Sequence, residues 1–350
     1  MKPFADSHVH IDGDTDASVR YMLDTLRDLG ITDASLLSLV ASPKHDIFQN
    51  ISTLHYKRTY TDIRLRAFGS FHETDLYAGI PYLEQTEALL ELGCDGIKFL
   101  HMKPDLRKVL GRGINHPDYD AAFSLMEERD VPVTIHSGDP ETFWDPSCVN
   151  PYQISRGWFY GDGTFPTCQE IYDEDFAMLD KHPRLRVTFA HFFFLSNRLD
   201  EAKRIMDKYP NVSFDLTPGW EMYLGFSKNI DAWRDFFIEH SDRILYGTDS
   251  NDTKKHNPKI HELVRTALRH DRTETPMPDH PGYTMRGLEL PESVIDKICY
   301  ENYISFVGEN PKPVNAAALL TAAERMLADL DGSEGNEKAT VWLKNFIENA

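Results

Sequence analysis

His8 and His10 are the first residues of this sequence whose types and spacing suggest chemistry. Both lie near the end of a short apolar run, residues 4–11, which has the length and composition of a β-strand. Successive side chains of a strand point to opposite faces, so the two imidazoles share one side and Val9 takes the other. Neighbouring imidazole nitrogens suit Zn²⁺ and similar ions, and Asp6 or Asp12 could orient a ring by accepting its N–H. The alternative is a pair of histidines without a ligand role.

Further residues with ligand chemistry follow other candidate strands. His136 ends the run PVTIH, His191 ends RVTFAH, and Asp249 follows ILYGT. Each has an ordinary structural explanation, such as a turn cap, a buried hydrogen-bonded histidine or a helix N-cap. Their repeated position at strand ends favours a site, because the carboxyl ends of parallel strands meet at one face of a barrel. The sequence therefore predicts that these residues gather with His8 and His10.

The elements that would position them are short apolar runs, each followed by a segment with helical periodicity. Candidate strands occupy residues 4–11, 34–41, 64–71, 96–102, 132–137, 186–191, 211–216 and 244–248. Candidate helices between them occupy residues 16–29, 47–60, 76–92, 119–129, 173–182, 197–209 and 231–240. Eight such repeats predict an α/β fold of the closed (β/α)8 or TIM barrel type. An open doubly wound sheet is the alternative.

We expect the barrel to occupy residues 1–308 and a C-terminal helical extension to occupy residues 309–350. After the eighth strand, helices are predicted at residues 258–268 and 291–307. Residues 315–330 and 340–347 predict two amphipathic helices in the extension. The extension is expected to pack on the barrel, and its alternative role is to form the interface of a homodimer.

Two predicted connections after strands, residues 138–172 and 218–229, are long enough to form substrate-binding loops. The first carries Trp144, Arg156 and Trp158, and the second carries Trp220. Indole rings suit flat substrates, and a guanidinium group suits a carboxylate. We therefore select these four as candidate substrate-binding residues. The alternative is that the rings only pack the loops and the charge is solvated.

Charge and composition exclude several other functions. The chain has 350 residues and a formal net charge of −19, so its surface should repel nucleic-acid phosphates and anionic lipids. No apolar stretch predicts a secretion signal or a membrane-spanning helix. Four cysteines without a C-x-x-C pair argue against a disulfide framework. We therefore expect a cytoplasmic protein that acts on a small molecule, without nucleic-acid or membrane partners.

Several segments together resemble the amidohydrolase superfamily, specifically its amidohydrolase-2-like branch of metal-dependent hydrolases and non-oxidative decarboxylases. They are DSHVH, GIKF, IHSG, FAH, YGTDS and the late segment LPESVIDKICYENYISFVG, so the resemblance spans residues 4–308. It implies that His8, His10, His136 and Asp249 bind one divalent metal ion, usually Zn²⁺ with Mn²⁺ as an alternative. It also implies that His191 polarises the substrate or moves a proton. Relatives commonly carry a glycine pair shortly after this histidine, whereas three phenylalanines follow it here, which implies a different pocket wall.

Lys98, in the segment GIKF, raises the question of a second metal ion. In two-metal members of the superfamily, a carboxylated lysine on the fourth strand bridges the ions. Lys98 and His101 lie three positions apart, which is an odd spacing, so strand alternation lets only one of them face the barrel interior. We favour a single metal ion, with Lys98 or His101 binding an anionic group of the substrate.

Together these residues predict a metal-dependent hydrolase that cleaves an amide, lactone or ester of a small carboxylate-bearing or aromatic compound. Metal-bound water would be the nucleophile, Asp249 would carry its proton to the leaving group, and His191 would stabilise the oxyanion. The alternative is a non-oxidative decarboxylase of an aromatic or unsaturated carboxylic acid, which would use the same site. A further alternative, from another class, is a non-catalytic binding barrel.

Overall fold

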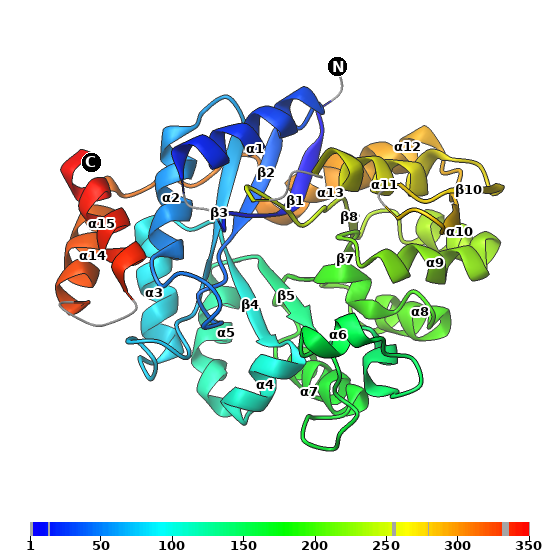
Figure 1. Ribbon diagram of the computed structural model, residues 1–350, viewed down its shortest axis with the longest axis horizontal. Coiled ribbons are helices and arrows are strands. Elements are labelled where there is room, and N and C mark those ends of the chain that lie inside the picture. Colours follow the sequence, from blue (N-terminus) through cyan, green and yellow to red (C-terminus); the bar gives the residue numbers. More distant parts are fainter. Residues whose placement is uncertain (1–2, 13–14, 254–256, 279, 331–335, 350) are drawn as a thin grey trace.

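The computed structural model describes residues 3–12, 15–253, 257–278, 280–330 and 336–349, with the backbone but not the side chain of Trp220. Strands lie in the middle of the molecule and helices lie around them (Figure 1). The strands of the main sheet are β1 (Ala5–His10), β2 (Asp33–Leu37), β3 (Arg64–Ser70), β4 (Gly96–Met102), β5 (Val133–Ser137), β6 (Val187–Phe189), β7 (Val212–Asp215), β8 (Ile244–Leu245) and β9 (Ser250–Asn251).

The main sheet is parallel, with the strand order β8-β7-β6-β5-β4-β3-β2-β1-β9. Its two edges belong to one segment, residues 244–251, in which β8 pairs with β7 and β9 pairs with β1. Between β8 and β9, the Ser7 amide donates to the Tyr246 carbonyl oxygen and the Asp249 amide donates to the His8 carbonyl oxygen, each at 2.9 Å. This segment therefore closes the sheet, and the predicted (β/α)8 barrel is confirmed.

Helices surround the strands of the barrel (Figure 1). They are α1 (Asp16–Asp28), α2 (Gln49–Thr59), α3 (Tyr82–Leu92), α4 (Pro104–Leu110), α5 (Asp120–Glu128), α6 (Pro151–Ser155), α7 (Cys168–Lys181), α8 (Leu199–Lys208), α9 (Trp220–Lys228), α10 (Ile230–Glu239), α11 (Asn257–Arg269), α12 (Glu292–Asp296), α13 (Asn302–Val307), α14 (Ala316–Asp329) and α15 (Glu337–Asn349). In α1, the buried residues Val19, Met22, Leu23 and Leu26 recur three or four apart and form one apolar face. Within the described ranges, no helix has the length and apolar character that crossing a membrane requires.

Several predicted boundaries are wrong, for local reasons. The segment 218–229 is not a loop, because it forms α9. Residues 138–172 contain the 3₁₀-helix η2 (Glu141–Trp144), α6 and the start of α7, which begins early because Thr167 and Glu170 form a capping box. Helix α3 begins at Tyr82 rather than at residue 76, since Pro81 occupies its N-cap. The antiparallel pair β10 (Glu274–Pro276) and β11 (Thr284–Arg286) was not predicted.

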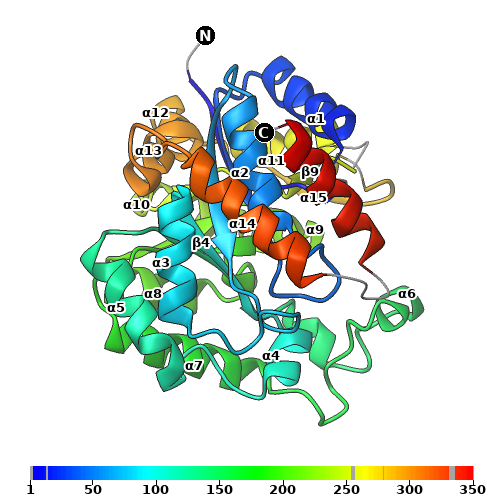
Figure 2. The ribbon, with the colours of Figure 1, turned by 90° about the vertical axis from the view of Figure 1, so that its left-hand side faces the viewer.

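The two C-terminal helices α14 and α15 lie beside α2 and α3 (Figures 1 and 2). The Trp342 indole stacks on the Phe48 ring, with centroids 4.7 Å apart, and the Tyr77 hydroxyl donates to Asp329 at 3.0 Å. At the start of this region, the buried Arg66 guanidinium donates to the Glu309 carbonyl oxygen at 3.0 Å. Residues beyond 308 thus pack against the barrel through apolar, aromatic and hydrogen-bonded contacts.

Candidate functional site

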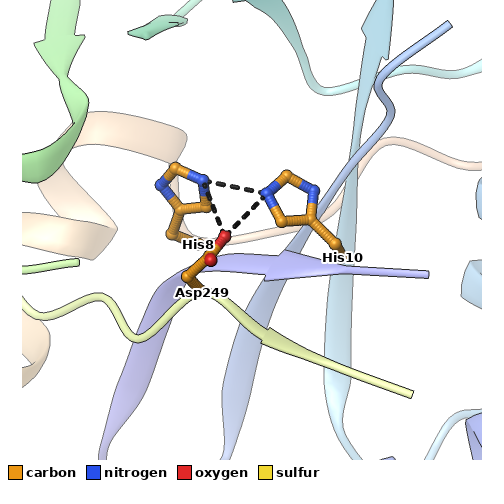
Figure 3. Close-up of side chains that lie close together, drawn as sticks. All are labelled: His8, His10 and Asp249. Carbon is orange, nitrogen blue, oxygen red and sulfur yellow. Dashed lines mark hydrogen bonds and ion pairs between the residues drawn. The ribbon is translucent and has the colours of Figure 1, made fainter. Parts of the chain in front are cut away.

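Three side chains meet at the carboxyl end of β1 and in the segment between β8 and β9 (Figure 3). The Nε2 atoms of His8 and His10 lie 3.0 Å apart. Asp249 Oδ1 lies 3.2 Å from His10 Nε2 and 3.9 Å from His8 Nε2. One ligand atom from each residue lies within 4.8 Å of the other two. The structure therefore brings together three of the four residues that the sequence analysis selected as metal ligands, and we call them the metal cluster.

Hydrogen bonds on the far sides of the two imidazole rings determine where their protons lie. His8 Nδ1 is 2.9 Å from Asp215 Oδ2, and His10 Nδ1 is 2.7 Å from the Leu37 carbonyl oxygen. Both partners are acceptors, so each Nδ1 carries the proton and each Nε2 presents a lone pair. These two lone pairs and the Asp249 carboxylate then face one another. A cation fits among them, and imidazole with carboxylate is a ligand set that Zn²⁺ takes in enzymes.

Burial keeps His8 and His191 neutral. The pKa of His8 lies well below its usual value because of burial and because of the neighbouring Lys98 ammonium and His10. Burial, together with the adjacent His136, lowers the pKa of His191 to about 3. A neutral imidazole keeps the lone pair that binds a metal or accepts a proton.

The backbone around Asp249 is held in place by β1. Asp249 has a φ of +57°, in the left-handed region that aspartate and asparagine tolerate better than most residues. The Asp6 carboxylate accepts from the His8 amide at 3.1 Å and from the Thr248 hydroxyl at 2.5 Å. The sequence suggested that Asp6 could orient a histidine ring. Asp6 instead connects the backbone of β1 to the segment that carries Asp249.

The ring of His8 is oriented by Asp215, which the sequence analysis did not select. Asp215 ends β7 and is fully buried. Besides facing His8, its carboxylate accepts from the amides of His191 at 2.9 Å and Thr217 at 3.1 Å. The signal that could have found it is its position after NVSF, at the end of the seventh predicted strand. The same criterion selected the other candidate ligands.

We expect Asp215→Asn to weaken zinc binding by about 10–100-fold. If the asparagine amide turns its N–H toward His8, Nδ1 must become the acceptor, and the proton moves to Nε2, which faces Asp249. Zinc affinity can be measured by competition with a chromophoric chelator. Asp175→Asn is the control, because the Asp175 carboxyl is also fully buried but is paired with the Ser137 hydroxyl. Wild-type zinc affinity in Asp215→Asn would contradict this role.

His136 and His191 form a second pair beside the metal cluster. His191 Nε2 lies 3.1 Å from His136 Nδ1, and the His191 ring centroid is 5.7 Å from that of His8. His191 Nδ1 faces the Thr217 carbonyl oxygen at 3.2 Å, so His136 Nδ1 is the donor to His191 Nε2. His136 Nε2 is buried and makes no hydrogen bond within the described residues, and the nearest acidic group is Asp139, whose Oδ1 lies 3.6 Å away. His136 is not part of the metal cluster, so the role of His136 as a metal ligand stays a prediction.

A cavity of about 830 Å³ is lined by both histidine pairs and by the predicted substrate-binding residues Lys98, Arg156 and Trp158. Lys98 is buried, its Nζ lies 3.4 Å from His8 Nε2, and burial lowers its pKa to about 8. The Arg156 guanidinium lies 5.6 Å from the centroid of the Trp158 ring, which stacks on Phe143. The cavity thus combines cationic and aromatic groups with the metal cluster.

Two other predicted substrate-binding residues, His101 and Trp144, do not line this cavity. His101 does not line the cavity, because it lies on the opposite side of β4 from Lys98 and its Nε2 contacts the Glu73 carboxylate. Trp144 does not line it either, because its indole N–H donates to the Pro166 carbonyl oxygen at 2.9 Å and so holds the loop together. The side chain of Trp220 lies outside the described residues.

The fold and the cluster define a class of protein: a parallel βα barrel with imidazole and carboxylate groups at the carboxyl ends of its strands, the face where barrel enzymes carry their active sites. A family model described as Amidohydrolase (Amidohydro_2) matches residues 6–304. The chain belongs to the amidohydrolase family, as the sequence resemblance predicted.

Three solved structures similar to this chain represent different activities within the shared fold. A putative amidohydrolase from Staphylococcus aureus is 15% identical, with 88% of this chain and 100% of that chain covered and a TM-score of 0.53. The structure of 2,6-dihydroxybenzoate decarboxylase complexed with 2,6-dihydroxybenzoate is 16% identical, with 88% of this chain and 100% of that chain covered and a TM-score of 0.52. 4-Oxalomesaconate hydratase from Rhodopseudomonas palustris is 12% identical, with 94% of this chain and 99% of that chain covered and a TM-score of 0.52. At these sequence identities, the structural similarity shows that the fold is shared and nothing more. No curated protein matches the chain.

Proposed function

We propose that this protein is a metal-dependent hydrolase that cleaves an amide, lactone or ester bond of a small carboxylate-bearing or aromatic compound. The observation that carries the proposal is the convergence of two imidazole lone pairs and one carboxylate at the mouth of a barrel. Two outer hydrogen bonds fix the tautomers of these imidazoles. Such an arrangement favours a bound divalent cation.

His8, His10 and Asp249 would hold one divalent ion, with Zn²⁺ favoured and Mn²⁺ as the alternative, and His136 would be the fourth ligand. A metal ion in such a site lowers the pKa of water toward about 7 and polarises a carbonyl oxygen. The buried His136 Nε2 lines the cavity and makes no hydrogen bond within the described residues, although Asp139 Oδ1 lies 3.6 Å away, and this supports its inclusion.

Proton transfer in the reaction is assigned to Asp249 and His191. The Asp249 carboxylate borders the cavity and can accept the proton of the attacking water and deliver it to the leaving group. His191 lines the same cavity, and its low pKa makes it a neutral imidazole whose Nε2, which accepts from His136 Nδ1, is the atom that would relay a proton.

Substrate binding is assigned to the cationic and aromatic groups of the cavity. Lys98 and Arg156 are the cations for a carboxylate of the substrate, and Trp158 supplies a flat apolar surface. The cavity volume of about 830 Å³ accommodates a small organic molecule.

A non-oxidative decarboxylase is the second candidate, and the position of Lys98 favours it. Its buried ammonium lies next to His8, where it could hold a carboxylate close to the metal cluster. His191 or Asp249 would then pass on a proton taken up from water, and this proton replaces carbon dioxide on the substrate. The two candidates differ in their products.

The experiment that tests the proposal begins with elemental analysis of protein purified without chelators or a histidine-rich tag. We expect about one equivalent of zinc or manganese per chain. Two equivalents would contradict the single-metal site and assign Lys98 to a bridge. Absence of metal, with no gain of activity when zinc or manganese is added, would overturn the proposal and favour a non-catalytic binding barrel.

The metal-loaded protein is then screened with aryl amides, lactones and esters and, separately, with aromatic carboxylic acids. We expect ring opening or acid release from the first group. Carbon dioxide release from the second group, without hydrolysis of the first, would establish the decarboxylase instead.

A further inference from the structure

The segment that follows β6 has an unusual backbone. His191, Phe192, Phe193 and Phe194 have φ values of +57°, +54°, +53° and +54°. None of these residues is a glycine, and each L-residue in this region is sterically disfavoured, so consecutive examples are rare. Such a turn persists only where its surroundings impose it. We call residues 191–194 the left-handed turn.

Contacts with neighbouring residues impose this conformation on the first three residues. The His191 amide donates to Asp215, and the Tyr172 hydroxyl donates to the Phe193 carbonyl oxygen at 2.9 Å. The Phe193 ring stacks on Phe189 with centroids 3.9 Å apart. Phe192 is buried among aromatic rings that include Phe214, Phe226, Trp233 and Phe237. Packing thus offsets the strain of the turn.

Phe194 differs from its two neighbours because it lines the cavity. In a turn with about three residues per turn, side chains at positions i and i+3 lie side by side. His191 and Phe194 have this spacing, and their rings stack with centroids 5.2 Å apart and planes 26° apart. Phe194 also lies beside His136, with centroids 5.7 Å apart. The left-handed turn therefore places an aromatic face against both histidines of the second pair.

We propose that Phe194 is a specificity-determining residue that selects substrates with a planar, unsaturated group next to the reacting carbon. The reaction that such a substrate would undergo rests on the proposed function, whereas the preference of the cavity for planar groups does not. A planar group can stack on the Phe194 ring, whereas a puckered saturated ring of the same size cannot.

Two carboxylic acids of equal charge and similar size test this preference: benzoate, which is planar, and cyclohexanecarboxylate, which is puckered. Their dissociation constants for the zinc-loaded protein are measured by calorimetric titration, without turnover. We expect wild type to bind benzoate roughly three- to tenfold more tightly. Phe194→Leu, which keeps apolar bulk but removes the aromatic face, should bind the two acids equally. Phe165→Leu, outside the cavity lining, is the control that should keep the preference.

An equal affinity of wild type for the two acids, or a preference that survives in Phe194→Leu, would overturn the proposal. Failure of wild type to bind either acid would overturn it as well. Backbone strain at Phe194 has a separate readout, the melting temperature. Phe194→Gly should melt roughly 2 °C above Phe194→Ala, because glycine adopts positive φ without penalty. A protein that shows the planar preference but hydrolyses no substrate would leave this inference standing while the proposed function fails.

Discussion

Asp249→Asn is expected to lower kcat by about 10²–10⁴-fold while changing KM much less. An asparagine amide cannot accept the proton of an attacking water, and it brings no negative charge to the two imidazoles of the metal cluster. The fold should survive, because Asp249 has a φ of +57° and asparagine is among the residues that tolerate this region. The substitution therefore separates the chemical role of the carboxylate from its structural role.

The measurement is steady-state kinetics of the substrate found by the screen, at saturating zinc so that weaker metal binding does not limit the rate. Asp24→Asn is the matched control, since Asp24 pairs with Arg27 on the exposed surface of α1 and should leave kcat unchanged. A kcat for Asp249→Asn within twofold of wild type would remove Asp249 from proton transfer and leave it a structural residue.

His10→Ala should bind zinc more than about 100-fold more weakly than wild type. The substitution removes a side chain that would contact the metal directly, whereas Asp215 only orients such a side chain. His10 presents its Nε2 to both His8 and Asp249. On its other side it donates to the Leu37 carbonyl oxygen, so the variant should also lose about 1–3 kcal/mol of unfolding free energy. The variant is expected to fold, because most of the barrel core does not involve this side chain.

Zinc affinity is again read by competition with a chromophoric chelator, and folding is checked by thermal unfolding in excess chelator. His116→Ala is the control, since His116 lies at the start of η1 (Pro117–Tyr119), outside the cavity lining. Unchanged zinc affinity in His10→Ala would mean that the metal lies elsewhere. The ligand set would then have to be rebuilt around His136 and His191.

Together with Asp215→Asn, these variants distinguish the roles of the residues around the proposed metal. Loss of a direct ligand should weaken zinc binding more than loss of the carboxylate that orients His8. Loss of the proton carrier at saturating zinc should appear in kcat. The Phe194 variants should instead change the choice between ligands. Three readouts, namely zinc affinity, kcat and ligand preference, thus report on four roles in one site.

Sequence alone determined the features that depend on residues close together in the chain. The alternation of His8, Val9 and His10 on β1 places two imidazoles on one side, because the period of a strand is local. The repeated βα pattern predicted the barrel, and position after a strand predicted that Asp249 and His191 would reach its mouth. Arg156 and Trp158, from a long connection on this face, line the cavity, and their binding of substrate stays a prediction.

Tertiary structure alone decided the features that depend on contacts between distant segments. Asp215 orients His8 across 207 residues of sequence, so no local pattern could reveal the pair. Alternation required that Lys98 and His101 face opposite ways, but only the packing of His101 on Glu73 decided which one enters the cavity. The left-handed turn contradicts local preference, because packing of its phenylalanines on β6, α7 and α10 outweighs backbone strain at His191.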